Sequence, residues 1–163
     1  MSETDELARQ VLAKCHAKDI MLATAESCTG GMIVAALTDI AGSSTVVDRG
    51  FVTYSNGAKM EMLGVRDETL RTHGAVSEET ALEMAAGALR HSRAGIAVSV
   101  TGIAGPDGGS AEKPVGLVWF GLARAGRETM AEKRLFDNRG RAFIRSESVE
   151  AALGMILAAL RDR

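Results

Sequence analysis

The stretch IMLATAESCTGGMIVAALTDI, residues 20–40, decides the fold of this chain. Residues 20–25 form a short apolar run, which is typical of a fully buried strand, and residues 31–40 are apolar enough for a packed helix. The turn between them, ESCTGG, combines an acid, two hydroxyls, a thiol and two glycines. A buried strand that leads through such a turn into a helix begins an α/β pattern, so we expect the rest of the chain to continue the alternation.

The remaining segments do alternate between strand and helix signals. Further strands are predicted at residues 45–54, 94–100, 117–123 and 128–136, and further helices at residues 5–18, 77–92 and from about 139 onward, with a short helical piece that ends at residue 63. Ser77 is a natural N-cap for its helix, and the acidic Glu78 and Glu79 fill the first turn. The last two strands are joined like an antiparallel hairpin. The pattern predicts an α/β fold in which a mixed sheet has helices on both faces, in one domain that spans residues 1–163.

The composition excludes several classes of protein. The 163 residues suit one compact domain, and 46% hydrophobic with 25% charged residues is an ordinary globular balance. A net charge of −2 and 4% aromatic residues provide neither a basic surface nor many stacking rings, so we expect no nucleic-acid partner. Residues 1–10 lack the basic flank and apolar run of a secretory signal, and the longest apolar run, residues 151–160, is too short to span a bilayer. We therefore expect a cytoplasmic protein without a membrane segment.

The cysteines and histidines indicate no metal site. Cys15 and Cys28 are too few for a disulfide framework, and neither belongs to a Cys-x-x-Cys pair or to a cluster of cysteine and histidine. We expect reduced thiols and neither a metal nor another cofactor.

Three loops that follow predicted strands carry the residues best suited to chemistry. These loops are ESCTGG, SNGAK and TGIAGPDGG. In open α/β sheets ligands bind beyond the carboxyl ends of the strands, so we expect the three loops to share one crevice. The last loop begins a long irregular segment, residues 101–116, and loops of that length in compact domains are often functional.

The loop ESCTGG has a structural and a functional interpretation. In the structural one, Ser27 or Thr29 caps the following helix, while Gly30 and Gly31 let the backbone pass close to a neighbour. In the functional one, Ser27 is a nucleophile, and the backbone N–H groups from Thr29 to Gly31 bind an oxyanion or a phosphate at the helix start. The two interpretations are compatible, and the common nucleophile and phosphate-binding fingerprints are absent from this sequence.

A serine nucleophile needs a base, and Lys59 is the best candidate. The three histidines are poorly placed, because His16 lies in the first helix, His73 in a connection and His91 near a helix end. Lys59 follows another strand, and a lysine that is desolvated in a crevice can lose its proton near neutral pH. The alternative is that Lys59 is one of 19 lysines and arginines and is simply solvated.

Other positions are open to two interpretations in the same way. Cys28 is either a rival nucleophile or a small buried packing residue. Thr101 ends a buried strand, and with Gly102 and Gly105 it is similar to an anion-binding nest, although the segment can also be a plain flexible loop. Arg145, near the start of the last predicted helix, is a candidate partner for a phosphate.

The segments AESCTGG, YSNGAKMEMLGV and VSVTGIAGPDGGSAEKPVG, in this order, closely resemble the CinA C-terminal domain family, and the resemblance covers nearly the whole chain. It implies a three-layer α/β/α sandwich with a mixed, mostly parallel sheet. It also implies hydrolysis of the carboxamide of nicotinamide mononucleotide to nicotinic acid mononucleotide and ammonia, in pyridine nucleotide salvage and without a metal. The family's serine nucleophile falls on Ser27 and its lysine on Lys59. Glu26, Tyr54 and Asn56 match further family positions, and the TGIAGPDGG segment matches the substrate loop.

In the mechanism that this resemblance implies, neutral Lys59 takes the proton of Ser27 as the hydroxyl attacks the carboxamide carbon, and an acyl-enzyme remains after ammonia leaves. We expect a small nucleotide as the substrate and a homo-oligomer, a dimer or higher, as the assembly. The alternative from another class is a catalytically silent module of the same family that binds a nucleotide or a protein partner. Ammonia release from nicotinamide mononucleotide separates the two. A role as an accessory protein in competence or DNA repair is disfavoured, because the acidity of the chain and its few aromatic rings argue against direct DNA contact.

Overall fold

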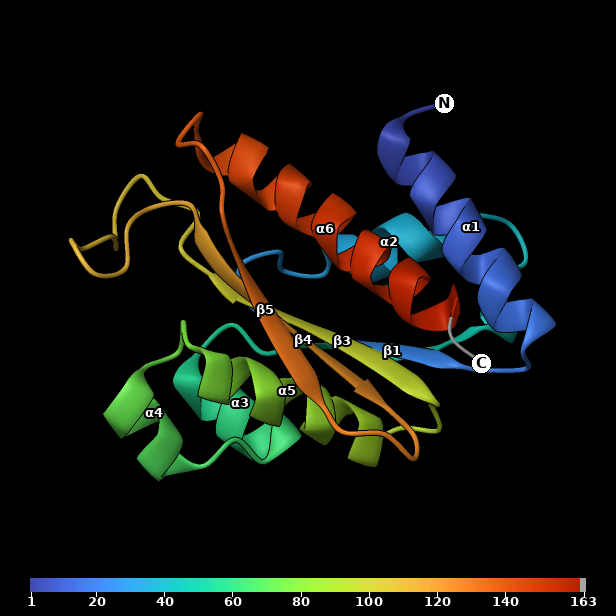
Figure 1. The fold of residues 1–163 in the computed structure, drawn as a ribbon, viewed down its shortest axis with the longest axis horizontal. Helices are drawn as coiled ribbons and strands as arrows, with labels where there is room; N and C mark the ends of the chain where they lie inside the picture. Colours follow the sequence, from blue (N-terminus) through green and yellow to red (C-terminus); the bar gives the residue numbers. More distant parts are fainter. Residues whose placement is uncertain (162–163) are drawn as a thin grey trace.

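A five-stranded sheet in the order β2-β1-β3-β4-β5 forms the centre of the described part of the chain (Figure 1). The computed structural model describes residues 1–161; Asp162 and Arg163, which end the predicted domain, lie outside the described residues. The strands are β1 (Leu22–Glu26), β2 (Val47–Val52), β3 (Ile96–Gly102), β4 (Leu117–Arg124) and β5 (Met130–Leu135). The helices are α1 (Glu3–Ala17), α2 (Met32–Thr38), the 3₁₀ turn η1 (Ser43–Thr45), α3 (Asn56–Leu63), α4 (Asp67–His73), α5 (Glu78–Arg90) and α6 (Arg141–Arg161).

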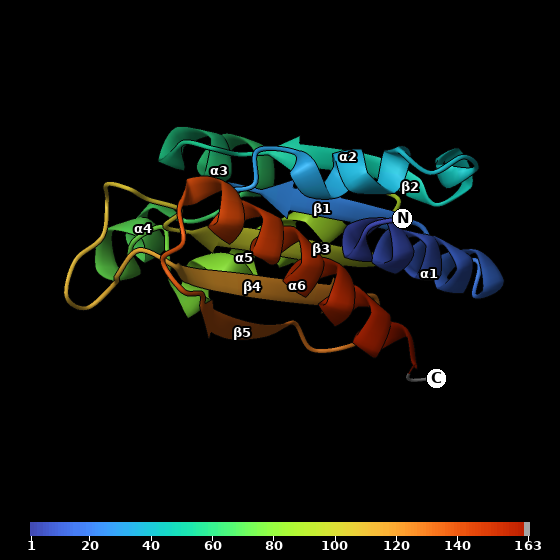
Figure 2. The same cartoon turned by 90° about the horizontal axis from the view of Figure 1, so that it is seen from above.

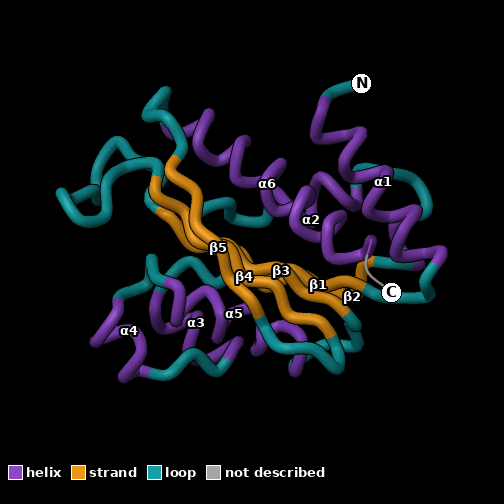
Figure 3. The backbone as a smooth tube through the Cα atoms, in the orientation of Figure 1, coloured by secondary structure: helices purple, strands orange, loops and turns teal. Residues whose placement is uncertain are grey.

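The sheet contains both parallel and antiparallel pairs. β1 lies between β2 and β3 and pairs with both in parallel, whereas β4 is antiparallel to β3 and to β5. Within residues 1–161, β4 is therefore the one strand that runs against the others. Figure 3 shows the strands as one layer between the helices. The predicted mixed, mostly parallel sheet with a late antiparallel hairpin is confirmed.

Helices cover both faces of this sheet and make three layers. Figure 1 shows α1, α2 and α6 on one face and α3, α4 and α5 on the other, and Figure 2 shows the first group lying across the strands from above. Each group has a core cluster of its own, built around Val11, Leu37 and Ile156 on one side and around Leu63 and Met84 on the other. The predicted α/β/α sandwich is confirmed.

The two faces of the sheet carry side chains of different size. Leu22, Val98 and Phe120 belong to the core under α1, α2 and α6, whereas the alternating positions Ala23 and Ala97 belong to the core over α5. The small side chains let α5 approach the sheet closely. A Cβ on Gly121 of β4 would lie only 2.3 Å from the carbonyl oxygen of Ala81, and the Ser99 hydroxyl donates a 2.7 Å hydrogen bond to that same oxygen.

Several helix boundaries differ from the prediction for local reasons. α1 begins earlier than expected, because Ser2 and Asp5 form a reciprocal capping box. α4 was not predicted, and the placement of His73 in a connection is wrong, since His73 is the last residue of that helix. The predicted cap at Ser77 is confirmed by a 3.2 Å hydrogen bond from the Thr80 N–H to its hydroxyl.

The start of α2 also differs from the prediction. The expectation that Ser27 or Thr29 caps this helix is wrong, because the N-cap residue is Gly31, which has a φ of 106° and no side-chain cap bond. The carboxylate of Glu26 accepts hydrogen bonds from the N–H groups of Ile33 and Val34 in the first turn instead. A residue five positions before the N-cap thus satisfies the free donors of the helix.

Candidate active site

The three strand-end loops meet around one cavity of about 220 Å³, as the sequence predicted. The residues that line it come from the loop after β1, from β2 to α3, from the segment before α5, from the end of β3 and from the start of α6: Ser27, Cys28, Tyr54, Asn56, Lys59, Ala75, Val76, Thr101, Gly102, Ala104 and Arg141. Both predicted catalytic residues, Ser27 and Lys59, line this cavity together with four predicted binding residues, Tyr54, Asn56, Thr101 and Gly102. They meet there because the fold brings distant segments together.

Backbone hydrogen bonds hold Ser27 at the carboxyl end of β1. Its N–H donates to the carbonyl of Val100 in β3 at 3.0 Å, and the carbonyl of the preceding Glu26 accepts from the Thr53 N–H at 2.8 Å. The side chain is buried, with 8% of its surface exposed. The end of β1 is therefore held from both sides, and Ser27 lines the cavity.

Lys59 lies in the first turns of α3 and is almost fully buried, with 1% of its surface exposed. The helix begins at Ser55, whose hydroxyl accepts from the Ala58 N–H at 3.0 Å. The Lys59 Nζ atom lies 2.9 Å from the Ser27 Oγ, 2.9 Å from the Thr53 carbonyl and 3.3 Å from the Tyr54 carbonyl.

Burial sets the protonation of this amine. Desolvation disfavours the ammonium form and lowers the pKa of Lys59 from 10.5 to about 8. Among the described residues no carboxylate forms an ion pair with Lys59 that would reverse this shift. The prediction of a desolvated lysine in a crevice is confirmed, and the alternative of a solvated side chain is wrong.

Cys28 lines the same cavity but is less suited to nucleophilic attack. Its side chain is buried, and burial raises the pKa of the thiol to about 11. A thiol with that pKa stays protonated near neutral pH, and the thiolate is the nucleophilic form. Burial and the raised pKa of the thiol therefore favour a packing role for Cys28 over a role as the nucleophile.

Exposed polar residues form the mouth of the cavity. Arg141, the first residue of α6, donates to the Tyr54 hydroxyl at 3.1 Å and to the Gly105 carbonyl at 2.7 Å. Asn56 and Tyr54 are exposed beside it. Sequence reasoning missed Arg141, although it lies one helical turn before Arg145 on the same helix.

The glycine-rich segment contributes less than predicted. Thr101 lines the cavity and donates its hydroxyl to the Ala75 carbonyl at 2.8 Å, which ties the end of β3 to the segment before α5. Gly102 also lines the cavity, and a Cβ there would lie 2.6 Å from Val118 Cγ2. Gly105 is buried outside the lining, and its carbonyl accepts from Arg141.

The structure does not bring the other predicted binding residues to the cavity. The residues in question are Glu26, Thr29, Gly30, Gly31 and Arg145. The amides of the two glycines are already engaged, since the Gly30 N–H donates to the Ser27 carbonyl and the Gly31 N–H to the Glu26 carboxylate. The prediction that these amides hold an oxyanion or a phosphate is therefore wrong, because intramolecular acceptors satisfy them.

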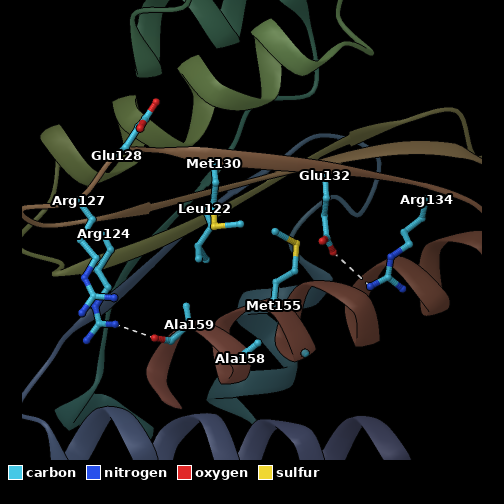
Figure 4. A pocket seen from close by; sticks show the side chains of 11 residues that line it. Leu122, Arg124, Arg127, Glu128, Met130, Glu132, Arg134, Met155, Ala158 and Ala159 are labelled. Atoms are coloured by element: carbon cyan, nitrogen blue, oxygen red, sulfur yellow. Dashed lines mark hydrogen bonds and ion pairs between the residues drawn. The ribbon is translucent and has the colours of Figure 1, made fainter. Parts of the chain in front are cut away.

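A second cavity, of about 380 Å³, lies between β5 and α6 (Figure 4). Figure 4 shows Met130, Leu122 and Met155 at its centre, with charged side chains around them. Several of these charges have partners nearby, since Arg124 donates to the Ala159 carbonyl at 2.6 Å and Arg134 pairs with Glu132 at 3.2 Å. None of the predicted site residues lines this cavity, which is separate from the Ser27–Lys59 pair.

Residues 1–161 contain neither a metal-ligand cluster nor a membrane-spanning helix. This part of the chain contains no group of three or more histidine, cysteine, aspartate or glutamate residues arranged to hold a metal ion. No helix in it combines the length and the apolar character that crossing a membrane requires. The expectation that the reaction needs no metal stays a prediction.

The fold and the site together define an α/β/α sandwich with a buried serine–lysine pair at the carboxyl end of a parallel strand. The sequence model of the CinA C-terminal domain family matches residues 4–160 of this chain. The chain belongs to this family, and the predicted resemblance is confirmed.

Alignments with several bacterial relatives cover nearly the whole chain. The nicotinamide-nucleotide amidohydrolase PncC of Escherichia coli K12 is 53% identical over 152 residues, which make up 93% of this chain and 92% of the relative. The PncC protein of Enterobacter agglomerans is 52% identical over 157 residues, or 96% of this chain and 93% of the relative. A CinA-like protein of Chlorobium phaeobacteroides is 50% identical over 97% of this chain, which corresponds to only 38% of that longer protein.

A crystal structure supports the same assignment. The competence/damage inducible protein CihA from Agrobacterium tumefaciens is 54% identical and superimposes with a TM-score of 0.96 over 99% of this chain and 98% of that one. The topology described above is therefore the family's topology.

Proposed function

We propose that this chain is a nicotinamide-nucleotide amidohydrolase, which hydrolyses nicotinamide mononucleotide to nicotinic acid mononucleotide and ammonia. Relatives that carry this name are 53% identical over more than nine-tenths of both chains. The observation that carries the proposal is the 2.9 Å hydrogen bond between the Lys59 Nζ and the Ser27 Oγ, inside a cavity that opens between the strand-end loops. A buried serine–lysine pair is a known variant of the catalytic triad.

The surroundings of Lys59 orient it as a base toward Ser27. A neutral amine has two N–H donors and one lone pair. The carbonyls of Thr53 and Tyr54 accept the two N–H groups, so the lone pair is left for the Ser27 O–H. The lowered pKa of about 8 makes the neutral amine accessible near physiological pH.

The reaction then proceeds in two balanced halves. The Ser27 oxygen attacks the carboxamide carbon while Lys59 takes its proton, and a tetrahedral intermediate forms. Lys59 returns that proton to the nitrogen as the C–N bond breaks, which releases ammonia and leaves an ester on Ser27. Water attacks the ester with Lys59 again as the base, and the ester bond breaks to release the carboxylic acid product and restore the serine.

A donor for the oxyanion of the intermediate comes from the residue after the nucleophile. The backbone N–H group of Cys28, which lines the cavity, donates no hydrogen bond to another described residue. In other serine hydrolases the amide directly after the nucleophile supplies such a donor. We assign the Cys28 amide in place of those of Gly30 and Gly31.

The rest of the cavity accommodates the nucleotide. Tyr54, Asn56 and Thr101 supply polar groups on its wall. Arg141 supplies a guanidinium at the mouth, which suits the phosphate because a guanidinium binds phosphate oxygens in a bidentate manner. In this proposal the chain acts as one domain in pyridine nucleotide salvage, and the catalytically silent binding module is the competing function.

Steady-state ammonia release by four purified proteins tests the proposal: wild type, Ser27→Ala, Lys59→Ala and the double variant. Each single variant is expected to lose several orders of magnitude in kcat, and the double variant to be little worse, because a nucleophile and its base act as a unit. Lys59→Arg is expected not to restore activity, since a guanidinium does not act as a base. Circular dichroism controls for folding. A wild-type protein that binds the nucleotide but releases no ammonia would establish the silent module.

A further inference from the structure

The turn that carries Ser27 is held by a buried carboxylate behind it. Glu26 has no exposed surface, and its carboxylate accepts five hydrogen bonds from the protein. The donors are the hydroxyls of Thr24 and Thr29 and the N–H groups of Gly31, Ile33 and Val34, at distances from 2.6 to 3.2 Å. Both carboxylate oxygens are engaged, so Glu26 binds the helix start and not a ligand.

A guanidinium holds the same turn through its carbonyl groups. Arg145 of α6 donates from Nε to the Cys28 carbonyl at 3.0 Å and from Nη2 to the Thr29 carbonyl at 3.3 Å. Its side chain is half-buried and lies outside the lining of the cavity. Gly30, the next residue, has a φ of 58°, and the Nη2 atom lies 3.4 Å from the position a Cβ would take there.

Glu26 and Arg145 therefore bind complementary backbone groups of the segment that follows β1. Glu26 accepts from its donors and Arg145 donates to its carbonyls, and hydrogen bonds with one charged partner are about twice as strong as neutral ones. The peptide plane is rigid, and its C=O and N–H point in opposite directions. A guanidinium that holds the Cys28 and Thr29 carbonyls thus fixes the peptide planes directly after Cys28, and with them the turn that presents the Ser27 hydroxyl and the Cys28 amide.

We infer that Glu26 and Arg145 are positioning residues, which together orient the Ser27 hydroxyl and the Cys28 amide that follows it for the reaction. This inference rests on the proposed function, and it reassigns Arg145 from phosphate contact to the support of the nucleophile. Misplacement of a reacting group by about 1 Å can cost roughly 100-fold in rate, so loss of either charge should act on turnover.

The experiment compares Glu26→Gln and Arg145→Gln with two matched arginine variants. Arg141→Gln changes the arginine at the mouth of the cavity, and Arg139→Gln changes an exposed arginine that lies over the Phe143 ring, 4.4 Å from its centroid. For each protein kcat and KM are measured with nicotinamide mononucleotide and with nicotinamide riboside, which lacks the phosphate. We expect Glu26→Gln and Arg145→Gln to lower kcat at least ~10-fold on both substrates with little change in KM.

The controls separate this role from the alternatives. Arg141→Gln should raise KM for the phosphorylated substrate only, and Arg139→Gln should behave as wild type. A merely structural role for Glu26 and Arg145 would lower the melting temperature but leave kcat per folded molecule unchanged, which would overturn the inference. A KM increase confined to the phosphorylated substrate in Arg145→Gln would overturn it as well and would make Arg145 a phosphate ligand.

A second measurement does not depend on amidase activity. The rate at which a small fluorophosphonate reagent modifies Ser27, followed by intact-protein mass spectrometry, should fall in Arg145→Gln by about the same factor as kcat. If wild type releases no ammonia, the proposed function fails while this labelling still tests the positioning role. If Glu26→Gln does not fold, Arg145→Gln and the more conservative Arg145→Lys, which keeps the charge but loses the two-pronged geometry, carry the test. Equal labelling rates in wild type and Arg145→Gln would refute the inference.

Discussion

In the proposed mechanism the reactivity of the site depends on the burial of one residue, Lys59. Only the neutral amine can accept the Ser27 proton, and its fraction increases with pH through a pKa of about 8. We therefore predict that kcat rises between pH 6.5 and 9.5 with a midpoint near that value and then levels off, as measured by ammonia release in buffers of constant ionic strength. A midpoint close to 10, the ordinary range for lysine, would show that burial does not tune this group.

The same shift has a consequence for stability. The pKa of Lys59 is about 8 in the folded protein and 10.5 without burial, so the unfolded chain binds more protons between these two pH values. In this window the contribution of Lys59 to the free energy of unfolding therefore increases with pH. Urea unfolding of wild type and Lys59→Met at pH 7 and pH 10 measures it: the stability difference between the two should shift in favour of wild type at the higher pH.

Cys28 gives a second prediction for a single residue. Its thiol stays protonated because burial raises its pKa to about 11, and we assign only its backbone amide to the reaction. Cys28→Ala should therefore retain a substantial part of wild-type kcat, because the amide is kept and only a small buried side chain is shortened. Complete loss of activity in a folded Cys28→Ala protein would move the nucleophile from Ser27 to Cys28.

Two helical glycines show how elements are packed around this site. Gly87 of α5 lies against the end of α3, where a Cβ would be 2.0 Å from the Leu63 carbonyl oxygen, whereas a Cβ on Gly154 of α6 would meet nothing within 4 Å. We predict that Gly87→Ala lowers the free energy of unfolding by about 2 kcal/mol or more, because α5 and α3 must separate. Gly154→Ala should raise it by about 0.5–1 kcal/mol, because alanine favours the helix.

Urea unfolding followed by circular dichroism measures both changes. Gly154→Ala serves as the matched control, since it makes the same chemical change in a helix with free space around it. Because Lys59 lies on α3, the Gly87 variant should also lose activity if the helix shifts. Equal stability of the two variants would contradict the close packing of α5 on α3.

For the molecule as a whole, we predict that the reaction proceeds without a metal. The described lining of the cavity offers no carboxylate and no imidazole, and serine, lysine, tyrosine and amide groups provide the polar contacts. Dialysis against a strong chelator should leave kcat unchanged, with a zinc-dependent amidase treated in parallel as a positive control. Activity that is lost on dialysis and restored by one added metal would contradict this prediction. The homo-oligomer also stays a prediction, which light scattering measures directly.

The sequence by itself determined the elements and the sites where chemistry was possible. Apolar runs and helical periodicity identified the strands, most of the helices and the mixed sheet, because these patterns report local burial. The strand-end loops with Ser27 and Lys59 followed, because parallel strands place their carboxyl ends at one edge. The short helix α4 escaped this reasoning, since seven residues carry little periodic signal.

Only the tertiary structure decided what the individual side chains do. The 2.9 Å distance from Lys59 to Ser27 and the lowered pKa depend on two segments that are 32 residues apart and on the burial of both residues. Glu26 and Arg145 were predicted to bind substrate, yet in the structure both form hydrogen bonds with the segment that follows Ser27, and Arg141 lines the cavity instead. The physical reason is that the partner of a polar side chain is set by packing between elements, which the spacing of residues along the chain does not encode.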